Sequence, residues 1–363
     1  MSDDRSVPFS VFLERALYDP DRGFYETGGR AGRRGDFVTS PEVGPLFGAC
    51  LARALDGWWR DLGRPDPFLV DEHGAGPGTL ARTVVVDRPE CADALRWTLV
   101  ERSAAQRALH PEHLPHVGDL AADGLSSAPG WSAVGGGPLV ASAAARPDRA
   151  VHVVVANELL DNLPFDLLER TADGWVEVRV ADHDGPTPVE VLVPAPETDA
   201  AWADAAAPGA SAGDRIPVQR AAGEWVAASV AQLAAGGRLV VLDYASTTAE
   251  VASRPATEWI RTYAGQARGG APLDAPGAQD VTVEVCVDQL VASAGPPDLD
   301  RDQASALRAW GLDDLVEEGR RLWTAAAPAP DLAALRARSR VAEAQALTDP
   351  TGLGAFRVLG WRT

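Results

Sequence analysis

Short, unbroken apolar runs recur along the chain and are followed by polar or glycine-rich residues. Four of these runs are Phe68–Val70, Trp97–Val100, Val151–Ala156 and Leu239–Leu242. Strands of a parallel sheet that is covered on both faces have this pattern, because neither side of such a strand meets water. The run Phe356–Trp361 predicts a last strand near the C-terminus. The chain is therefore expected to have an α/β fold built on a mostly parallel sheet.

Helical periodicity precedes the first of these strands, across residues 6–62. Ser10 is placed to cap a helix that ends at Leu17. A second helix is expected to begin after Pro41 and to continue to Trp59, because apolar residues recur there at helical spacing.

Composition excludes several classes of protein. The chain has 363 residues and a formal charge of −19, and all 33 of its basic residues are arginine. Nucleic-acid binding is not expected, since neutralising phosphates requires a basic surface. The first residues have no apolar signal segment and no 18-residue apolar run occurs, so a cytoplasmic protein without a membrane span is expected. The cysteines Cys50, Cys91 and Cys286 are too far apart to indicate a zinc site or a disulfide framework.

A glycine-rich turn, Gly74–Gly78, follows the first strand directly. Glycines at such a place permit a tight turn and the close approach of a ligand to the backbone. The spacing is GxGxG, which differs from the GxGxxG of dinucleotide dehydrogenases. Glu72, two residues before the first glycine, is placed to accept a hydrogen bond from a cationic or amine-bearing ligand. This favours an aminoacyl cofactor over a pyrophosphate, although a purely structural turn is the alternative.

The second acidic residue of interest, Glu101, comes directly after the next strand. In nucleoside-binding α/β folds a carboxylate at this place can hold both ribose hydroxyls, because it offers two acceptor oxygens. The alternative is an ordinary solvated acid at the start of a helix.

A polar cluster, Asn157–Pro164, follows the third of the four runs. Ligands bind outside the carboxyl ends of parallel strands, so this segment is expected to face the reactive end of a cofactor. Glu158 and Asp161 would share one face of a helical turn, where two carboxylates could orient a guanidinium or accept its proton. The alternative is that the acids only complement a helix dipole.

Three closely spaced histidines, His110, His113 and His116, are interpreted as part of a loop that binds no metal. Pro111 and Pro115 interrupt any helix that would align them, and no acidic or cysteine ligands complete a metal site.

Together these motifs resemble the MidA-type methyltransferases, a family that includes the mitochondrial complex I assembly methyltransferase. The resemblance covers about 350 residues. It is carried, in order, by Tyr18-Asp19-Pro20, Gly23-Phe24-Tyr25, Gly35–Glu42, Glu72 with the glycine turn, Val100–Ser103, Ala156–Pro164, Asp243-Tyr244, Ile260–Tyr263 and Gly352–Leu359. The sequence departs from the family pattern at His73, where an apolar residue is usual, and at Ala75, where proline is common.

The resemblance implies a class I, seven-stranded Rossmann-like methyltransferase core, S-adenosylmethionine as cofactor and methylation of protein arginine. The candidate cofactor-binding residues are Glu72, Gly74, Gly76, Gly78, Glu101, Asp119 and Asn157, and the candidate catalytic residues are Asn157, Glu158 and Asp161. Two alternatives remain open: a methyltransferase for a small molecule, and a non-catalytic assembly factor that retains the cofactor pocket. A nicotinamide dehydrogenase is less favoured because of the glycine spacing.

The resemblance and the element order divide the chain into four expected regions. Residues 121–150, rich in Ala, Gly, Pro and Asp, are expected to form a surface connection or an insertion. The regions are an N-terminal helical extension (1–64), a Rossmann-like cofactor-binding core (65–244) with an insertion around 182–213, a lid or substrate-side insertion (245–290) and the C-terminal part of the core sheet (291–363).

Overall fold

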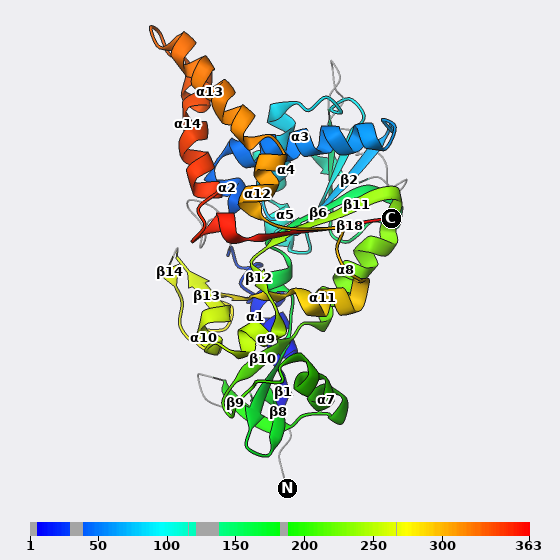
Figure 1. Ribbon diagram of the computed structural model, residues 1–363, viewed down its shortest axis with the longest axis vertical. Coiled ribbons are helices and arrows are strands. Elements are labelled where there is room, and N and C mark those ends of the chain that lie inside the picture. The colour runs from blue at the N-terminus through cyan, green and yellow to red at the C-terminus, as the bar shows by residue number, and fades with distance from the viewer. Residues whose placement is uncertain (1–5, 30–38, 115, 121–137, 182–187, 266) are drawn as a thin grey trace.

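The computed structural model describes residues 6–29, 39–114, 116–120, 138–181, 188–265 and 267–363. The two largest sheets organise these residues, and they lie in the upper half and at the lower end of an elongated molecule (Figure 1). The larger sheet has eight strands and the smaller one has five.

The larger sheet is mostly parallel, which confirms the predicted fold class. Its strands lie in the order β17 (Leu299–Asp302), β18 (Arg357–Arg362), β11 (Leu233–Asp243), β6 (Val151–Asn157), β2 (Phe68–His73), β3 (Leu95–Val100), β5 (Leu139–Ala143) and β4 (Gly118–Asp119). The strands from β11 to β4 run parallel, whereas β18 is antiparallel to β11 and β17 is antiparallel to β18. All five strands predicted from apolar runs belong to this sheet. The eighth strand beyond the expected seven is the two-residue β4 at the edge.

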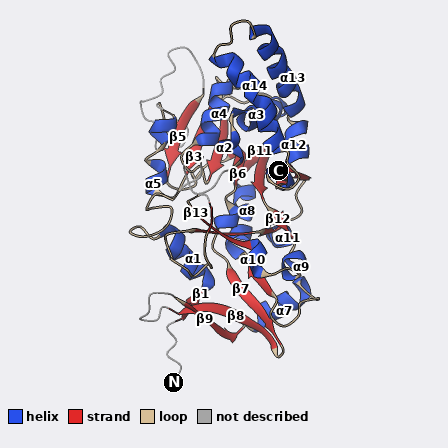
Figure 2. Cartoon of the chain, turned by 90° about the vertical axis from the view of Figure 1, so that its left-hand side faces the viewer, coloured by secondary structure: helices blue, strands red, loops and turns tan. Residues whose placement is uncertain are grey.

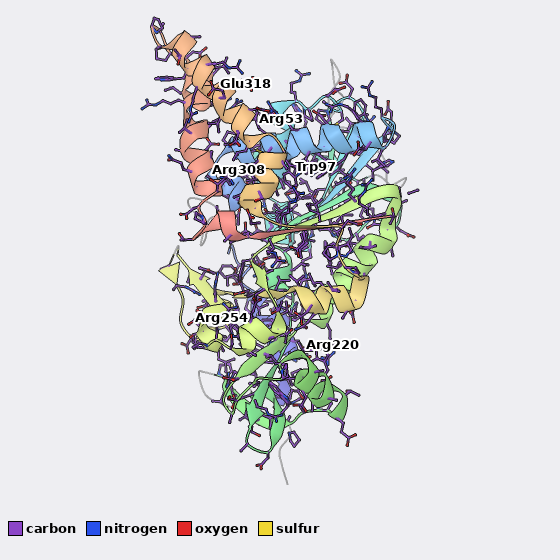
Figure 3. The ribbon with its side chains drawn as sticks, viewed as in Figure 1. Arg53, Trp97, Arg220, Arg254, Arg308 and Glu318 are labelled. Atoms are coloured by element: carbon purple, nitrogen blue, oxygen red, sulfur yellow. The ribbon has the colours of Figure 1, made fainter. Side chains whose placement is uncertain are left out.

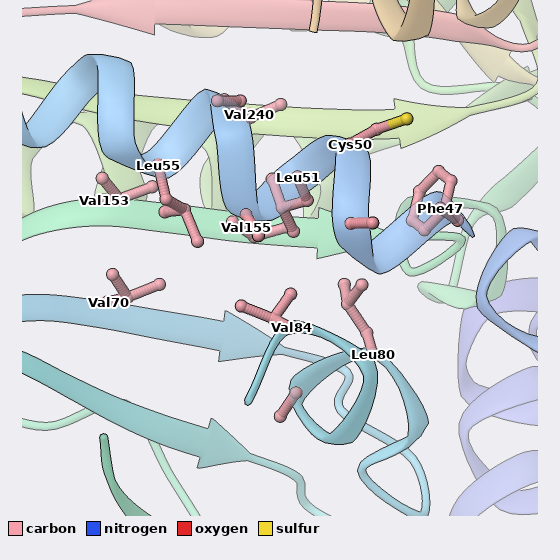
Figure 4. Close-up of a cluster of buried hydrophobic side chains, with 14 of the residues drawn as sticks. Phe47, Cys50, Leu51, Leu55, Val70, Leu80, Val84, Val153, Val155 and Val240 are labelled. Atoms are coloured by element: carbon pink, nitrogen blue, oxygen red, sulfur yellow. The ribbon is translucent and has the colours of Figure 1, made fainter. Parts of the chain in front are cut away.

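Helices cover both faces of this sheet. They are needed there because the strands present apolar side chains alternately to one face and the other. On one face, α3 (Pro45–Asp61) and α4 (Thr79–Asp87) pack on side chains that include Val153 and Val155 (Figure 4). On the other face, α8 (Arg220–Gln232) and α11 (Val287–Ala294) pack on Val154 and Ala156. Both sets are fully buried, which explains why β6 reads as an unbroken apolar run.

Three C-terminal helices follow β17: α12 (Gln303–Ala309), α13 (Leu312–Ala326) and α14 (Leu332–Leu347). The last two project from the body as a pair (Figures 1 and 2). The Arg53 guanidinium of α3 lies 3.8 Å from the Glu318 carboxylate in the middle of α13 and so links this helix to the core (Figure 3).

The link from β5 to β6, residues 144–150, crosses the sheet face without forming a helix. It passes over β3 and β2, which lie between the two strands it connects. Arg149 donates to Asp71 Oδ1 at 2.6 Å and to Thr98 Oγ1 at 2.9 Å. This buried ion pair fixes the link to the sheet. The prediction of a mere surface connection over 121–150 was wrong for its described part, because β5 is a core strand in the sheet.

The smaller sheet consists of β1 (Ser6–Pro8), β8 (Gly174–Ala181), β7 (Asp166–Thr171) and β10 (Arg215–Val218), with β9 (Val189–Pro194) also paired to β8. It packs with α1 (Phe9–Tyr18), and α7 (Glu197–Ala206) lies beside it. The segment 182–213, expected as an irregular insertion, thus contributes a strand and a helix to a larger antiparallel unit. Within this unit β8 alternates apolar and polar residues over Val176–Val180, which is a signal for one strand and not for the whole sheet.

Several local expectations need correction. Ser10 lies inside α1 and does not cap it, since its hydroxyl contacts Asp166 of β7. The helix expected after Pro41 is divided into α2 (Ser40–Val43) and α3, because Gly44 is extended and the next residue is proline. His110 begins a short helix, α6 (His110–His113), since a proline is tolerated at the first helical positions.

The remaining short elements lie between the two sheets or follow β3. They are α5 (Ala104–Arg107), β12 (Ala245–Ser246), α9 (Thr248–Ala252), α10 (Ala256–Trp259), β13 (Ile260–Ala264), β14 (Ala267–Arg268), β15 (Asp280–Val283) and β16 (Val285–Cys286). Across the described residues, every helix is too short or too polar to cross a membrane.

Candidate cofactor and active site

A cavity of about 320 Å³ opens at the C-terminal ends of β2, β3 and β6. Residues 74–77 of the glycine turn, Glu101 and residues 157–159 line it, and so do Tyr18 and Tyr25 of the N-terminal extension. Ligands of open parallel sheets bind at this edge. The volume lies within the range of small-molecule sites, roughly 300–1,000 Å³.

The glycine turn leaves room for a ligand against its backbone. Gly74, Gly76 and Gly78 have φ values of +65°, +52° and +86°, which disfavour any side chain. A Cβ on Gly76 would meet nothing within 4 Å, so this backbone faces open space in the cavity. A Cβ on Gly74 would lie 2.8 Å from Leu159. Gly78 precedes α4 and is not among the lining residues, so its role is to turn the chain into the helix.

Glu101 connects the glycine turn to the segment after β3. Its Oε2 accepts from the Gly76 N–H at 2.9 Å, and its Oε1 accepts from the Ser103 N–H at 2.8 Å. Burial raises the pKa of this carboxyl. Each oxygen retains a second lone pair, and Glu101 lines the cavity, so it can accept from two ribose hydroxyls.

Glu72 lines the cavity but is already engaged by the protein. Its Oε2 accepts from the indole N–H of Trp97 at 2.9 Å. Burial raises its pKa to about 8, so this carboxyl holds a proton at neutral pH in the absence of a cationic ligand. The Glu72 carboxyl therefore lies where the sequence predicts a hydrogen-bond acceptor. It becomes a carboxylate at neutral pH only when a positive charge lies nearby.

Glu158 has a strained backbone and a carboxyl held from two sides. Its φ is +52°, a left-handed conformation that is uncommon for a residue with a side chain. Oε1 accepts from the Ser40 N–H at 3.1 Å and from Asn157 Nδ2 at 3.0 Å. Both bonds use the same oxygen, which leaves Oε2 available. Burial raises the pKa of Glu158 to about 7.

Asn157 completes this end of the cavity with an acceptor atom. Its amide N–H₂ is used by Glu158, whereas its Oδ1 is buried without a hydrogen-bond partner among the described residues. Such an atom is positioned to accept an N–H from a ligand.

Asp161 does not share a face with Glu158, contrary to the expectation. The left-handed turn at Glu158 leads into a 3-10 turn, Leu160–Asn162, which directs Asp161 away from the lining residues. Asp161 is buried near Asp243, and burial together with the Asp243 charge raises its pKa. Asp243 in turn accepts from the Leu160 and Asp161 N–H groups.

Asp119 also lies outside the cavity lining. It is an exposed residue of the edge strand β4, which pairs with Ser142 of β5. The other acids of the prediction, Glu72, Glu101 and Glu158, are brought together around one cavity, as are Gly74, Gly76 and Asn157.

The sequence interpretation missed part of the lining. Tyr18 and Tyr25 stack with their ring centroids 5.5 Å apart, and Tyr25 donates to buried Asp280. Both tyrosines lie in motifs of the family resemblance, which was the available signal. Arg146 and Trp225 come from the crossing link and α8, and no sequence pattern indicated them.

The polar atoms of the cavity fit an adenosyl amino acid. Besides Asn157 Oδ1, the buried atoms Thr79 Oγ1 and Gln106 Oε1 have no partner among the described residues, and both residues line the cavity. A nucleoside and an amino acid carry the donors and acceptors that such atoms require. Within the described ranges, His, Cys, Asp and Glu form no group of three or more that could hold a metal ion.

Residues 50–300 match a family model described as "Putative S-adenosyl-L-methionine-dependent methyltransferase". The chain belongs to this family. Its cofactor is S-adenosylmethionine, in agreement with the geometry of the glycine turn and of Glu101.

Two curated relatives are named as arginine methyltransferases. The protein arginine methyltransferase NDUFAF7 of Danio rerio is 25% identical over 324 residues, which are 85% of this chain and 75% of that protein. The NDUFAF7 homologue of Drosophila melanogaster is 29% identical over 196 residues, which are 49% of this chain and only 43% of that protein. The chain thus matches less than half of the fly relative's length.

A solved structure matches nearly the whole fold. A COG1565 superfamily member from Burkholderia thailandensis, bound to S-adenosyl-homocysteine, has a TM-score of 0.79 and 28% sequence identity. The match covers 99% of this chain and 88% of that one. The likeness therefore includes the smaller sheet as well as the methyltransferase core.

Proposed function

We propose that this protein transfers the methyl group of S-adenosylmethionine to the guanidinium of an arginine side chain in a protein. The observation that carries the proposal is the Glu158 carboxyl, held beside the unpartnered Asn157 Oδ1 at the edge of the cofactor cavity. The names of the curated relatives support the same acceptor.

The charge around the cavity favours a cationic acceptor. The carboxyl groups of Glu42, Glu72, Glu101 and Glu158 belong to lining residues. Behind the wall, Asp280 accepts from Tyr25 and from Asn162 Nδ2, at 3.1 and 2.9 Å. A guanidinium entering here would meet carboxyl oxygens that can accept its N–H groups and aromatic rings that stabilise a delocalised cation.

When bound, the cofactor supplies a methyl group on a positively charged sulfur. The protein then has to orient a guanidino nitrogen, and Asn157 Oδ1 can accept one of its N–H groups. A new N–C bond would form as the sulfur–methyl bond breaks, the bonding electron pair would stay on the sulfur of the departing S-adenosylhomocysteine, and the nitrogen would lose a proton. Glu158 Oε2 is the acceptor for that proton, since a carboxyl with a pKa of about 7 is balanced between its two forms near neutrality.

The experiment is a transfer assay with methyl-labelled S-adenosylmethionine and cell-extract proteins, followed by hydrolysis and identification of the labelled amino acid. Methylarginine in the protein fraction is expected for the wild type and for Glu177→Gln, a matched change in β8 of the smaller sheet. Glu158→Gln is expected to lose the signal.

The two alternatives give different outcomes in the same assay. Label confined to the low-mass fraction would indicate a small-molecule acceptor. Cofactor binding with no transfer to any fraction would indicate a non-catalytic assembly factor.

A further inference from the structure

One part of the cavity wall differs in charge from the acidic remainder. His73 at the end of β2, Arg146 in the crossing link and Trp225 of α8 form it. Arg102, the other arginine of the lining, is paired with Glu14, so its charge is compensated.

Arg146 is held in place by neutral groups only. Its Nη2 donates to Ser229 Oγ at 2.8 Å and to the Trp225 carbonyl at 3.4 Å, and its Nη1 donates to Gln232 Oε1 at 3.4 Å. The guanidinium carbon lies 5.6 Å from the centre of the Trp225 ring. In the part of the chain that the structure describes, Arg146 forms no ion pair. Its positive charge is thus fixed in the wall without a carboxylate in direct contact.

The one carboxylate that acts on Arg146 through space, Asp71, is paired directly with another arginine. Its Oδ1 is bonded to Arg149. A half-buried guanidinium without a carboxylate is costly unless a ligand provides one.

His73 gives a second, independent indication of a ligand. It is 4% exposed, and its ring lies edge-on to Trp225 with the centroids 5.4 Å apart. Its Nε2 is buried without a hydrogen-bond partner among the described residues. Burial and the charge of Arg146 lower its pKa to about 3, so the ring is neutral and can donate one N–H. A donor beside an uncompensated cation fits an anion.

We propose that Arg146, assisted by His73, is the carboxylate-binding point of the cavity. The inference rests on the proposed function, since both sources of a carboxylate take part in that reaction. One source is the α-carboxylate of the cofactor's amino-acid part. The other is a carboxylate on the acceptor, near its methylated arginine. Two different donors, a guanidinium and an imidazole N–H, would hold its two oxygens.

The test compares two pairs of ligands, and in each pair only one member carries the carboxylate. S-adenosylhomocysteine and 5′-methylthioadenosine share the nucleoside and the sulfur, but only the first has the amino-acid part. A Gly-Arg-Gly peptide and its C-terminal amide, each titrated with S-adenosylhomocysteine present, form the second pair. Calorimetry is done on the wild type, Arg146→Gln, Arg146→Lys and the control Arg238→Gln. Arg238 also lies 5.6 Å from a tryptophan ring, that of Trp58, but does not line the cavity.

The expected result is a loss of about tenfold or more in affinity for one carboxylate-bearing ligand in Arg146→Gln, with its carboxylate-free partner unchanged. Loss for S-adenosylhomocysteine identifies the cofactor as the source, and loss for the free-acid peptide identifies the acceptor. Arg146→Lys should lose less, and Arg238→Gln should lose nothing.

If Arg146→Gln weakened the binding of both ligands of each pair equally, Arg146 would only support the structure of the cavity wall, and the inference would be overturned. Unchanged affinity of Arg146→Gln for all four ligands would overturn the inference as well. Failure of the wild type to bind either nucleoside would instead contradict the proposed function, so the two failures are distinguishable.

Discussion

The backbone N–H of Ser40 donates to Glu158 Oε1 at 3.1 Å, across 118 residues of sequence. The contact joins the N-terminal extension to the end of β6. Ser40 is itself fixed, because its hydroxyl donates to Gln303 Oε1 of α12 at 2.9 Å. The extension therefore orients the carboxyl that we assign to proton transfer, which explains why a methyltransferase core would retain such an extension.

Glu158→Gln should lower the rate of methyl transfer by about 10²–10⁴-fold, because an amide cannot accept the proton. Its size and its acceptor oxygen are kept, so affinity for S-adenosylhomocysteine should change little. Single-turnover transfer and calorimetry on the same preparation measure the two effects. A normal rate in this variant would remove Glu158 from the mechanism.

Gly76→Ala should weaken cofactor binding strongly while leaving the fold intact. The added methyl group would enter open cavity space at a φ of +52°, at a strain cost on the order of 1 kcal/mol. Gly63→Ala is the matched control, since Gly63 has a φ of +79° and an equally open Cβ position at the far end of α3. Thermal unfolding should show similar losses for both variants, and calorimetry should show lost affinity for Gly76→Ala alone. Equal affinities would mean that no ligand approaches Gly76.

Stability of the unliganded protein should fall as the pH rises from 6.5 to 8. Burial raises the pKa of Glu72 to about 8 in the folded state, against 4.5 when unfolded. Unfolding in this window therefore releases a proton, and it becomes easier as the pH rises. Below pH 6.5 the lowered pKa of His73 makes stability rise with pH, which opposes the effect of Glu72. The range from pH 6.5 to 8 is therefore the one that reports on Glu72. Each such proton contributes a slope of up to about 1.4 kcal/mol per pH unit.

Glu72→Gln should flatten this dependence, since its amide is neutral at every pH and can still accept from Trp97. Urea unfolding at pH 6.5, 7.25 and 8 measures the slope. The slope should not vanish, because Glu158 contributes in the same direction. An unchanged slope would show that Glu72 is ionised in the folded protein.

The buried pair of Asp71 and Arg149 should be essential to the fold. Asp71→Ala leaves a buried guanidinium without its carboxylate, and should reduce the free energy of unfolding by about 3–5 kcal/mol. Asp71→Asn keeps an acceptor oxygen and should cost less. Chemical denaturation compares the two variants, and equal small losses would mean that solvent reaches Arg149.

The cofactor half of the molecule was predictable because its signals are local. Strands buried on both faces, such as β6, leave unbroken apolar runs, and the glycine turn follows one of them directly. Glu72, Glu101 and Glu158 each come at a strand end, so the parallel topology alone brings them to one edge of the sheet.

The smaller sheet and the exact lining of the cavity could not be predicted, because they depend on contacts between residues far apart in the sequence. The smaller sheet pairs β1 with β8, more than 160 residues apart, and no local pattern indicates such a pairing. Asp161 was misplaced because a helical turn was assumed where Glu158 is left-handed. Arg146 reaches the cavity only because residues 144–150 cross the sheet without a helix.

Calorimetric titration of S-adenosylhomocysteine into the wild type and Glu101→Ala tests the central claim most directly, namely that this cavity is the cofactor site. Glu101 fixes the glycine turn and offers acceptors to the ribose, so its removal acts on both. We predict saturable binding of one equivalent by the wild type and a loss of affinity of at least about tenfold in Glu101→Ala. No binding by the wild type, or equal affinity in the variant, would contradict the account.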